Sequence, residues 1–475
     1  MKAHYKKRGE FILKFFDCQQ FVKPEYVVDK LPSNKEIYKN TLDIAMPSTV
    51  ESVLIALISC VDMMMVGSIG ADAIAAVGIT NQPKFIILAV ILALNVGVTV
   101  VVSHRKGEQD KKAANQCLAQ ALTISCIISL ILSVLGFVFS KQIVVFAGAT
   151  EQYATLASVY FKSIMVGNFF NSMSMTINAA QKGSGNTKIA MKTNLTANVV
   201  NLIFNYFLIN GIAFFPKLGV LGAGIATSIG NVVAFFMSLA SVSHSDHFLY
   251  LEAHYFGRFD QKTLKDLLNI SSSSFAEQVF LRIGFFAYSK TIATLGMVAF
   301  ATHNVCMNLL TISFAFGDGL SVATSSLVGQ SLGAKRKDMA LIYSKVTQHI
   351  GNIVGIVLGI VMIIFRSQLV ALFTRDPEII ERGSELVFII TITVFFQITQ
   401  VVTYGCLRSA GDVKFTAGLS LVSVTFISPI FTWLFCYPLA MGLFGAWISL
   451  FLDQFGRYFG SRWRYKKEKW LDISI

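Results

Sequence analysis

The chain repeats itself, and this repeat constrains its fold more than any other feature. A shift of 226 residues places Glu51 on Glu277, and many other landmarks of the first half fall on the second half in the same way. Near the end the shift becomes 223, where Gly222 falls on Gly445. One nearly constant shift over most of a chain indicates two copies of one structural unit. In an apolar chain such duplication is typical of transporters that bind their substrate between the repeats.

The composition places this duplicated chain in a membrane. Hydrophobic residues make up 54% of the chain and charged residues only 14%, whereas soluble domains contain about 25% charged residues. The net charge of +13 does not indicate a nucleic-acid partner, because the basic residues gather in short loops between apolar runs. The seven cysteines are scattered and include no CxxC pair. We therefore expect neither a disulfide framework nor a zinc site.

Twelve apolar stretches are long enough to cross a bilayer, which takes roughly 20 helical residues. We predict an all-α integral membrane protein with about twelve transmembrane helices. The predicted spans are 45–67, 76–103, 113–139, 152–181, 190–210 and 219–242 in the first copy, and 267–293, 299–330, 338–365, 378–407, 415–437 and 440–460 in the second.

The basic loops predict the orientation. Loops 105–112 and 335–337 are equivalent in the two copies, and both are rich in lysine and arginine. Because such residues mark cytoplasmic loops, equivalent loops lie on one side and each copy has an even number of spans. Six spans per copy form two six-helix lobes related by a parallel pseudo-twofold axis. We expect a monomeric, multi-pass protein of the plasma (inner) membrane with both termini in the cytoplasm.

This prediction divides the chain into five parts. They are a cytoplasmic N-terminal segment (1–44), an N-lobe (45–242), a cytoplasmic linker (243–266), a C-lobe (267–460) and a basic cytoplasmic tail (461–475). The apolar stretch FILKFF in the first part is too short to span a membrane. It lies either on the membrane surface or in a cytoplasmic arm.

Charged residues within the spans are the main candidates for function, because a charge inside a bilayer is costly and usually faces a cavity or a partner. Asp62 lies in the first span, and its equivalent in the second copy is Tyr288. Desolvation disfavours the carboxylate form, so Asp62 can take up a proton. The alternatives are a bound sodium ion and a hydrogen bond that only packs two helices.

A second group of charged residues lies deep in the spans. Glu51 and Glu277 are equivalent, and Arg282 and Asp318 fall at similar depth in the second copy. Glu277, Arg282 and Asp318 form either a structural ion-pair cluster or part of a substrate or cation site. A pair of glutamates facing a cleft would favour cationic ligands.

Asparagines mark one face of the fifth span. Asn194, Asn198, Asn201 and Asn205 recur at spacings of four, three and four residues, so they stack on one side of a helix. We expect them to line a polar cavity, although single asparagines often only bridge helices. Phosphate-binding and hydrolase motifs are absent from the sequence, so we expect no enzyme activity, no ATP hydrolysis and no cofactor.

Several segments resemble the multidrug and toxic compound extrusion (MATE) transporters over roughly residues 45–465. They include LISCVDMMMVG in the first span, GVLGAGIATSIG at 219–230 and LRSAGDVKF at 407–415. The resemblance implies alternating access that exports cationic amphipathic drugs in exchange for protons or sodium ions. It also implies a coupling site in the N-lobe made of Asp62, Asn201, Asn205 and Thr227. Many members carry aspartate where this chain has Asn205, which favours protons over sodium.

The predicted substrate-binding residues combine the deep charges with nearby polar side chains. They are Glu51, Asn198, Glu277, Gln278, Arg282, Asn308 and Asp318. The alternative function is a flippase for lipid-linked saccharides from a related superfamily. That function requires a cleft rich in arginine and lysine, whereas the sequence shows more deep acids than deep bases. A membrane enzyme or receptor is a third possibility, which the repeat and the missing catalytic motifs disfavour.

Overall fold

The structure is a computed structural model that describes residues 17–212, 215–257 and 260–473, so the FILKFF stretch lies outside the described residues. Each predicted span corresponds to one long helical element. The N-lobe contains α2 (Asn34–Gly67), α3 (Ala71–Gly107), α4 (Lys111–Val138), α6 (Glu151–Gly183), α7 (Thr187–Asn210) and α8 (Val220–Ala240), with the short α5 (Ser140–Phe146).

The C-lobe repeats this order with one interruption. It contains α9 (Gln261–Ala293), α10 (Met297–Gly333), α11 (Lys337–Ile364), the short α12 (Arg366–Ala371), α13 (Pro377–Ser409), α14 (Val413–Ser420), η4 (Leu421–Ile427), α15 (Ser428–Cys436) and α16 (Gly442–Lys466). The segment η4 is a π-helix that joins α14 and α15 into one span. Eight of the described helices are long and apolar enough to cross a membrane by length and composition alone.

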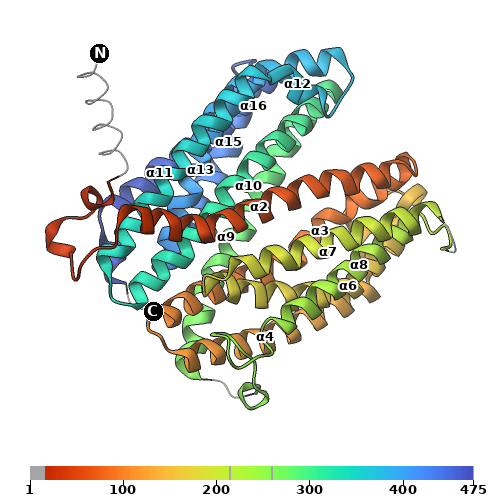
Figure 1. The fold of residues 1–475 in the computed structure, drawn as a ribbon. Helices are drawn as coiled ribbons and strands as arrows, with labels where there is room; N and C mark the ends of the chain where they lie inside the picture. Colours follow the sequence, from red (N-terminus) through yellow and green to blue (C-terminus); the bar gives the residue numbers. More distant parts are fainter. Residues whose placement is uncertain (1–16, 213–214, 258–259, 474–475) are drawn as a thin grey trace, which may run out of the picture.

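The two lobes converge at one end and diverge toward the other, with α2 between the two bundles (Figure 1). We call these ends the closed end and the open end. At the closed end α3 packs directly on α10. A Cβ added at Gly107 would collide with the carbonyl oxygen of Gln330, and one added at Gly333 would collide with that of His104. Small residues let the two backbones approach closely. The contact is symmetric, because the 226-residue shift places Gly107 on Gly333 and His104 on Gln330.

The backbone follows the repeat at the turns as well. Gly185 and Gly411 adopt left-handed φ angles of 88° and 86° at equivalent helix ends, and Gln109 and Lys335 do so at 59° and 57°. Equivalent turns therefore have the same local geometry. The parallel two-lobe arrangement predicted from the sequence is confirmed.

The described ends of the chain meet at the closed end, on the C-lobe. Lys23 pairs with Glu468 at 3.0 Å, and Lys337 of α11 pairs with Asp472 at 2.6 Å. The hydrogen bond from Lys23 to Glu468 raises the pKa of Lys23. These contacts attach the segment before α2 and the segment after α16 to the same lobe.

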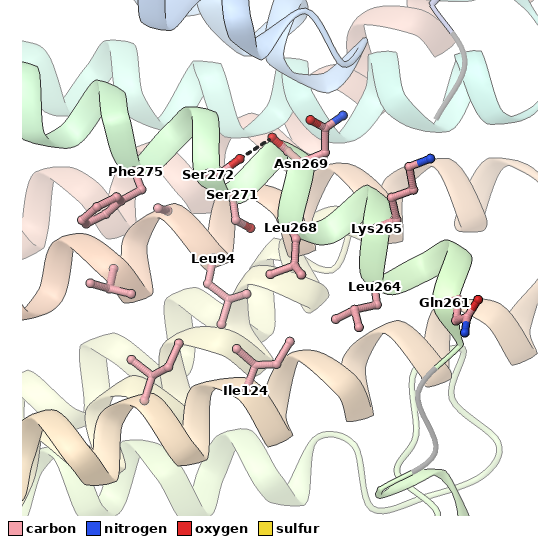
Figure 2. Close-up of a pocket in the computed structure, with 13 residues that line it drawn as sticks. Leu94, Ile124, Gln261, Leu264, Lys265, Leu268, Asn269, Ser271, Ser272 and Phe275 are labelled. Carbon is pink, nitrogen blue, oxygen red and sulfur yellow. Dashed lines mark hydrogen bonds between the residues drawn. The ribbon is translucent and has the colours of Figure 1, made fainter.

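Two apolar grooves follow the two seams between the lobes. One, of about 790 Å³, lies between α9 and the pair α3 and α4, where Leu94, Ile124 and Leu268 face one another (Figure 2). The other, of about 360 Å³, lies between α2 and the pair α10 and α11. This second groove is lined by Leu42, Leu320 and Ile350, which are the repeat equivalents of the three residues named for the first groove. Apolar side chains make up most of the lining of both grooves, and the first groove also borders Gln261, Lys265 and Asn269 of α9.

Candidate functional site

The N-lobe site is built along the line where α2 packs on α7. Asn194 donates a hydrogen bond of 2.6 Å to Glu51, and Asn205 donates one to Asp62. Both pairs are separated by 143 residues, so the two helices run parallel and in one register. The asparagine stripe predicted from the sequence thus faces the two acids of α2.

Asp62 stands at the end of a hydrogen-bonded chain of side chains. The amide of Asn205 that donates to Asp62 is 3.4 Å from the Oδ1 atom of Asn201, and the amide of Asn201 donates to Thr227 at 3.2 Å. The hydroxyl group of Thr227 donates to the carbonyl oxygen of Ala223. The structure therefore brings together all four residues predicted for the coupling site. The Oδ1 atom of Asn205 is buried without a hydrogen-bond partner among the described residues.

A lysine near this site was missed by the sequence analysis. Lys84 of α3 lies near Asp62, although no ion pair between them is found in the described part of the chain. Its equivalent in the C-lobe is Leu310, so the base, like the acid, belongs to one lobe only. The signal was available, since Lys84 is the sole charged residue within the predicted span 76–103.

The equivalent region of the C-lobe is apolar. Tyr288 occupies the position of Asp62 and is 1% exposed within a hydrophobic cluster. Its hydroxyl group donates to the carbonyl oxygen of Ala446 at 3.2 Å. Phe431 stands where the N-lobe has Asn205. The two lobes share a backbone plan but not this polar network.

The two lobes do share a buried ion pair at equivalent positions. Lys182 of α6 binds Glu51 at 2.8 Å, and Arg408 of α13 binds Glu277 at 2.7 Å. Asn194 completes the first site, and Ser420, at the equivalent position, donates to Glu277 at 3.0 Å. Both glutamates are 2–3% exposed. The acids were predicted from the sequence, whereas the two bases fall just after the predicted spans 152–181 and 378–407 and were not recognised.

Glu277, Arg282 and Asp318 line one cavity without pairing with one another. Glu277 binds Arg408, and the guanidinium of Arg282 lies 4.5 Å from the ring centre of Phe85 on α3. Asp318 is exposed to the cavity and accepts a hydrogen bond of 3.1 Å from Ser52 of α2. The structure therefore places the three residues together but not as the ion-pair cluster considered from the sequence.

This cavity lies inside the C-lobe, between α9, α10, α13 and α16, with Leu92 of α3 at its edge. Its volume is about 520 Å³. Charged and amide side chains from all four helices share its lining with aromatic and aliphatic ones. The polar members are Glu277, Gln278, Arg282, Thr311, Asp318, Ser321, Gln397, Gln400, Tyr404, Arg408, Gln454 and Arg457. Such a mixture suits an amphipathic ligand.

The remaining predicted substrate residues fall in different places. Gln278 lines the C-lobe cavity, whereas Asn308 is exposed on α10 outside its lining. Asn198 lies in the N-lobe and donates to the carbonyl oxygen of Asn194 at 2.7 Å.

The structure also changes the balance of deep charges. Lys84, Lys182, Arg408 and Arg457 all lie between helices, in addition to Arg282. With Asp453, which pairs with Arg457, the deep acids and the deep bases are equal in number, so an excess of acids no longer argues against a flippase.

The fold and these sites define a membrane transporter built from two repeated helical lobes. The MatE family model matches residues 47–207 and 274–434, one match in each lobe and together more than half of the chain. The chain therefore belongs to the MATE family of multidrug efflux transporters.

Individual relatives agree over nearly the whole length. The chain is 27% identical over 444 residues to an uncharacterized transporter, YisQ, of Bacillus subtilis, covering 93% of this chain and 96% of the relative. It is 26% identical over 426 residues to the probable multidrug resistance protein NorM of Thermotoga maritima, covering 88% and 90%.

A solved structure shows the same fold. The outward-facing conformation of a multidrug resistance MATE family transporter of the MOP superfamily aligns with a TM-score of 0.85 and 19% identity. The alignment covers 94% of this chain and all of that one.

Proposed function

We propose that this chain is a secondary active antiporter that exports amphipathic organic compounds with a basic group in exchange for protons, by alternating access. The observation that carries this proposal is the hydrogen bond from Asn205 to Asp62 inside one lobe only. A single acid within a helical bundle can change its charge state as access changes, and its neighbours then repack. The N-lobe supplies the coupling site and the C-lobe cavity the substrate site.

Protons fit the N-lobe site better than sodium ions. A sodium ion, like other hard cations, requires several oxygen ligands and benefits from negative charge. Asp62 is the only carboxylate in the network, and Lys84 of α3 lies near it. An acid with one amide donor and a lysine nearby needs no metal ion to satisfy it.

Alternating access requires the closed end to separate and the open end to close. The contact between α3 and α10 at Gly107 and Gly333 must then break. The hydrogen bond between Ser52 and Asp318 also joins helices of different lobes, so it changes in the same movement. A ligand drives such a change only as far as it binds the two states with different affinity. We propose that the protein lies in the plasma (inner) membrane with its closed end on the cytoplasmic side. The equivalent basic loops lie at the closed end, and such loops mark the cytoplasmic side of a membrane protein.

The C-lobe cavity supplies the groups for a basic substrate. Asp318 is exposed to the cavity and has a hydroxyl group, not a base, as its hydrogen-bond partner. The field of an ionised Asp318 attracts an ammonium group, and Phe314 and Phe285 provide apolar walls. A small-molecule substrate of this kind needs no partner protein, and we propose that the monomer is the working unit.

Transport by purified protein in liposomes tests the proposal. Proton and sodium gradients are imposed separately, and the movement of a fluorescent cationic amphipath is recorded. We expect transport with a proton gradient, none with a sodium gradient alone, and none in Asp62→Asn under either. Transport by Asp62→Asn at the wild-type rate would refute the assignment of the coupling site.

A further inference from the structure

The C-lobe cavity contains more positive charge than a site for simple cations requires. Three arginines line it, namely Arg282, Arg408 and Arg457, against two acids, Glu277 and Asp318. Two of the arginines are neutralised, since Arg408 binds Glu277 at 2.7 Å and Arg457 binds Asp453 at 2.5 Å. One base and one acid therefore remain without an oppositely charged contact.

The remaining base is Arg282. Within the described ranges no carboxylate lies within ion-pair distance of it, and its Nε atom is buried without a hydrogen-bond acceptor. Its charge contacts the face of Phe85 instead. A cation–π contact leaves the planar N–H groups of a guanidinium free, and those groups match the two oxygens of a carboxylate. A deep arginine without a counter-ion is costly, so an anionic ligand group would be stabilised there.

The remaining acid is Asp318, which lines the same cavity. A base and an acid in one cavity, each without an ion-pair contact within the described residues, complement a molecule that has both charges. A compound with a single positive charge satisfies Asp318 but leaves Arg282 unpaired and adds repulsion from it. Gln278, Gln397 and Gln400 line the same cavity, and their amides can bind further polar groups of the ligand.

We infer that the C-lobe cavity prefers zwitterionic amphipathic compounds, with a carboxylate bound by Arg282 and a basic group near Asp318. This inference rests on the proposed export function, and it narrows the substrate class of the same cavity. Arg282 would be a specificity residue: it decides which amphipaths bind, while Asp62 decides whether binding is coupled to an ion.

Binding to the purified protein tests the inference without requiring transport. The probes are a rhodamine with a free carboxylate, which is a zwitterion, and its methyl ester, which is a cation of nearly the same shape. Fluorescence polarisation gives the Kd of each dye for the wild type, Arg282→Gln, Arg282→Lys and the control Arg366→Gln. Arg366 is an exposed arginine of α12 that also stacks on a phenylalanine, 4.9 Å from the ring centre of Phe388.

We expect the wild type and Arg366→Gln to bind the free acid more tightly than the ester. Arg282→Gln should weaken binding of the acid about tenfold or more and change that of the ester by less than about twofold. Arg282→Lys should restore part of the preference, because it keeps the charge but not the planar geometry.

Three results would overturn the inference. They are a wild type that binds neither dye or prefers the ester, an Arg282→Gln variant that keeps the acid preference, and an equal loss for both dyes. The comparison of the two dyes on the wild type still tests the inference if Arg282→Gln does not fold. If the binding preference is found but liposomes show no ion-driven transport, the antiport proposal fails and the zwitterion site stands.

Discussion

The amide of Asn205 on α7 donates a hydrogen bond to the carboxylate of Asp62 on α2. Eleven residues earlier on both helices, Asn194 donates to Glu51 in the same register. The two acids nevertheless differ, because Glu51 also binds Lys182 whereas Asp62 has only the more distant Lys84. We propose on this difference that Glu51 has a structural role and that Asp62 is the coupling residue.

Replacing Asp62 by Asn should abolish proton-driven efflux without unfolding the protein. An asparagine keeps a hydrogen-bonding side chain next to Asn205 but cannot bind and release a proton. Efflux from liposomes and the melting temperature should be measured together. Asp72→Asn is a suitable control, since Asp72 is an exposed aspartate at the start of α3 that accepts a hydrogen bond from Gln152. That variant should transport normally.

Asn205→Asp should make the N-lobe site respond to sodium ions. The change places a second carboxylate beside Asp62, which supplies the negative charge that a hard cation favours. We expect sodium, but not potassium, to raise the melting temperature of the variant, while the wild type shows no difference between the two salts. A sodium-specific stabilisation of the wild type would contradict the proton assignment.

Lys84→Gln should also increase the affinity for sodium, and for a different reason. Removing the ammonium group removes repulsion between Lys84 and an ion bound at Asp62, without adding a ligand. The effect should add to that of Asn205→Asp in the double variant if each acts on the same ion. An unchanged sodium response in both Lys84→Gln and the double variant would show that Lys84 does not influence the site.

Lys182→Met should destabilise the protein by about 3–5 kcal/mol, because it leaves the buried carboxylate of Glu51 without its counter-ion. The double variant Glu51→Gln with Lys182→Met removes both charges and should recover much of that loss. Chemical denaturation in detergent measures both. If the single and double variants are equally stable, Glu51 does not depend on this ion pair.

Gly107→Ala should favour separation of the lobes at the closed end. The added Cβ collides with the backbone carbonyl group of Gln330, which cannot move away as the end of a flexible side chain could. Spin labels on the exposed residues Lys112 of the N-lobe and Lys335 of the C-lobe would report the separation, in a background without reactive cysteines. We expect longer distances in the variant. Gly78→Ala is the matched control, because an added Cβ there meets nothing within 4 Å.

The architecture could be predicted from the sequence because each transmembrane helix has a local signal in the chain. Long apolar runs predict spanning helices wherever they occur, and the 226-residue shift predicts two equivalent lobes without any contact being known. Asp62 and the asparagine stripe could be recognised for the same reason. A polar residue in an apolar run, or a spacing of three and four residues, is visible along one stretch of chain.

The pairing of charges could not be predicted in this way. Lys182 and Arg408 lie near helix ends, where lysine and arginine normally mark a loop. Only the tertiary structure brings Lys182 of α6 to Glu51 of α2 and Arg408 of α13 to Glu277 of α9. For the same reason Arg282 was grouped with the nearby Glu277, although its guanidinium stacks on Phe85 from the other lobe.

By itself, the amino-acid sequence determined that this is a duplicated, twelve-span membrane protein with one unmatched acid in its first half. The tertiary structure alone decided which charges neutralise one another and which are left facing a cavity. The physical reason is the distance over which each effect acts along the chain. Hydrophobicity and helical periodicity act between neighbours in the chain, whereas an ion pair depends on atoms a few ångströms apart in space, here 131 residues apart in sequence in both lobes.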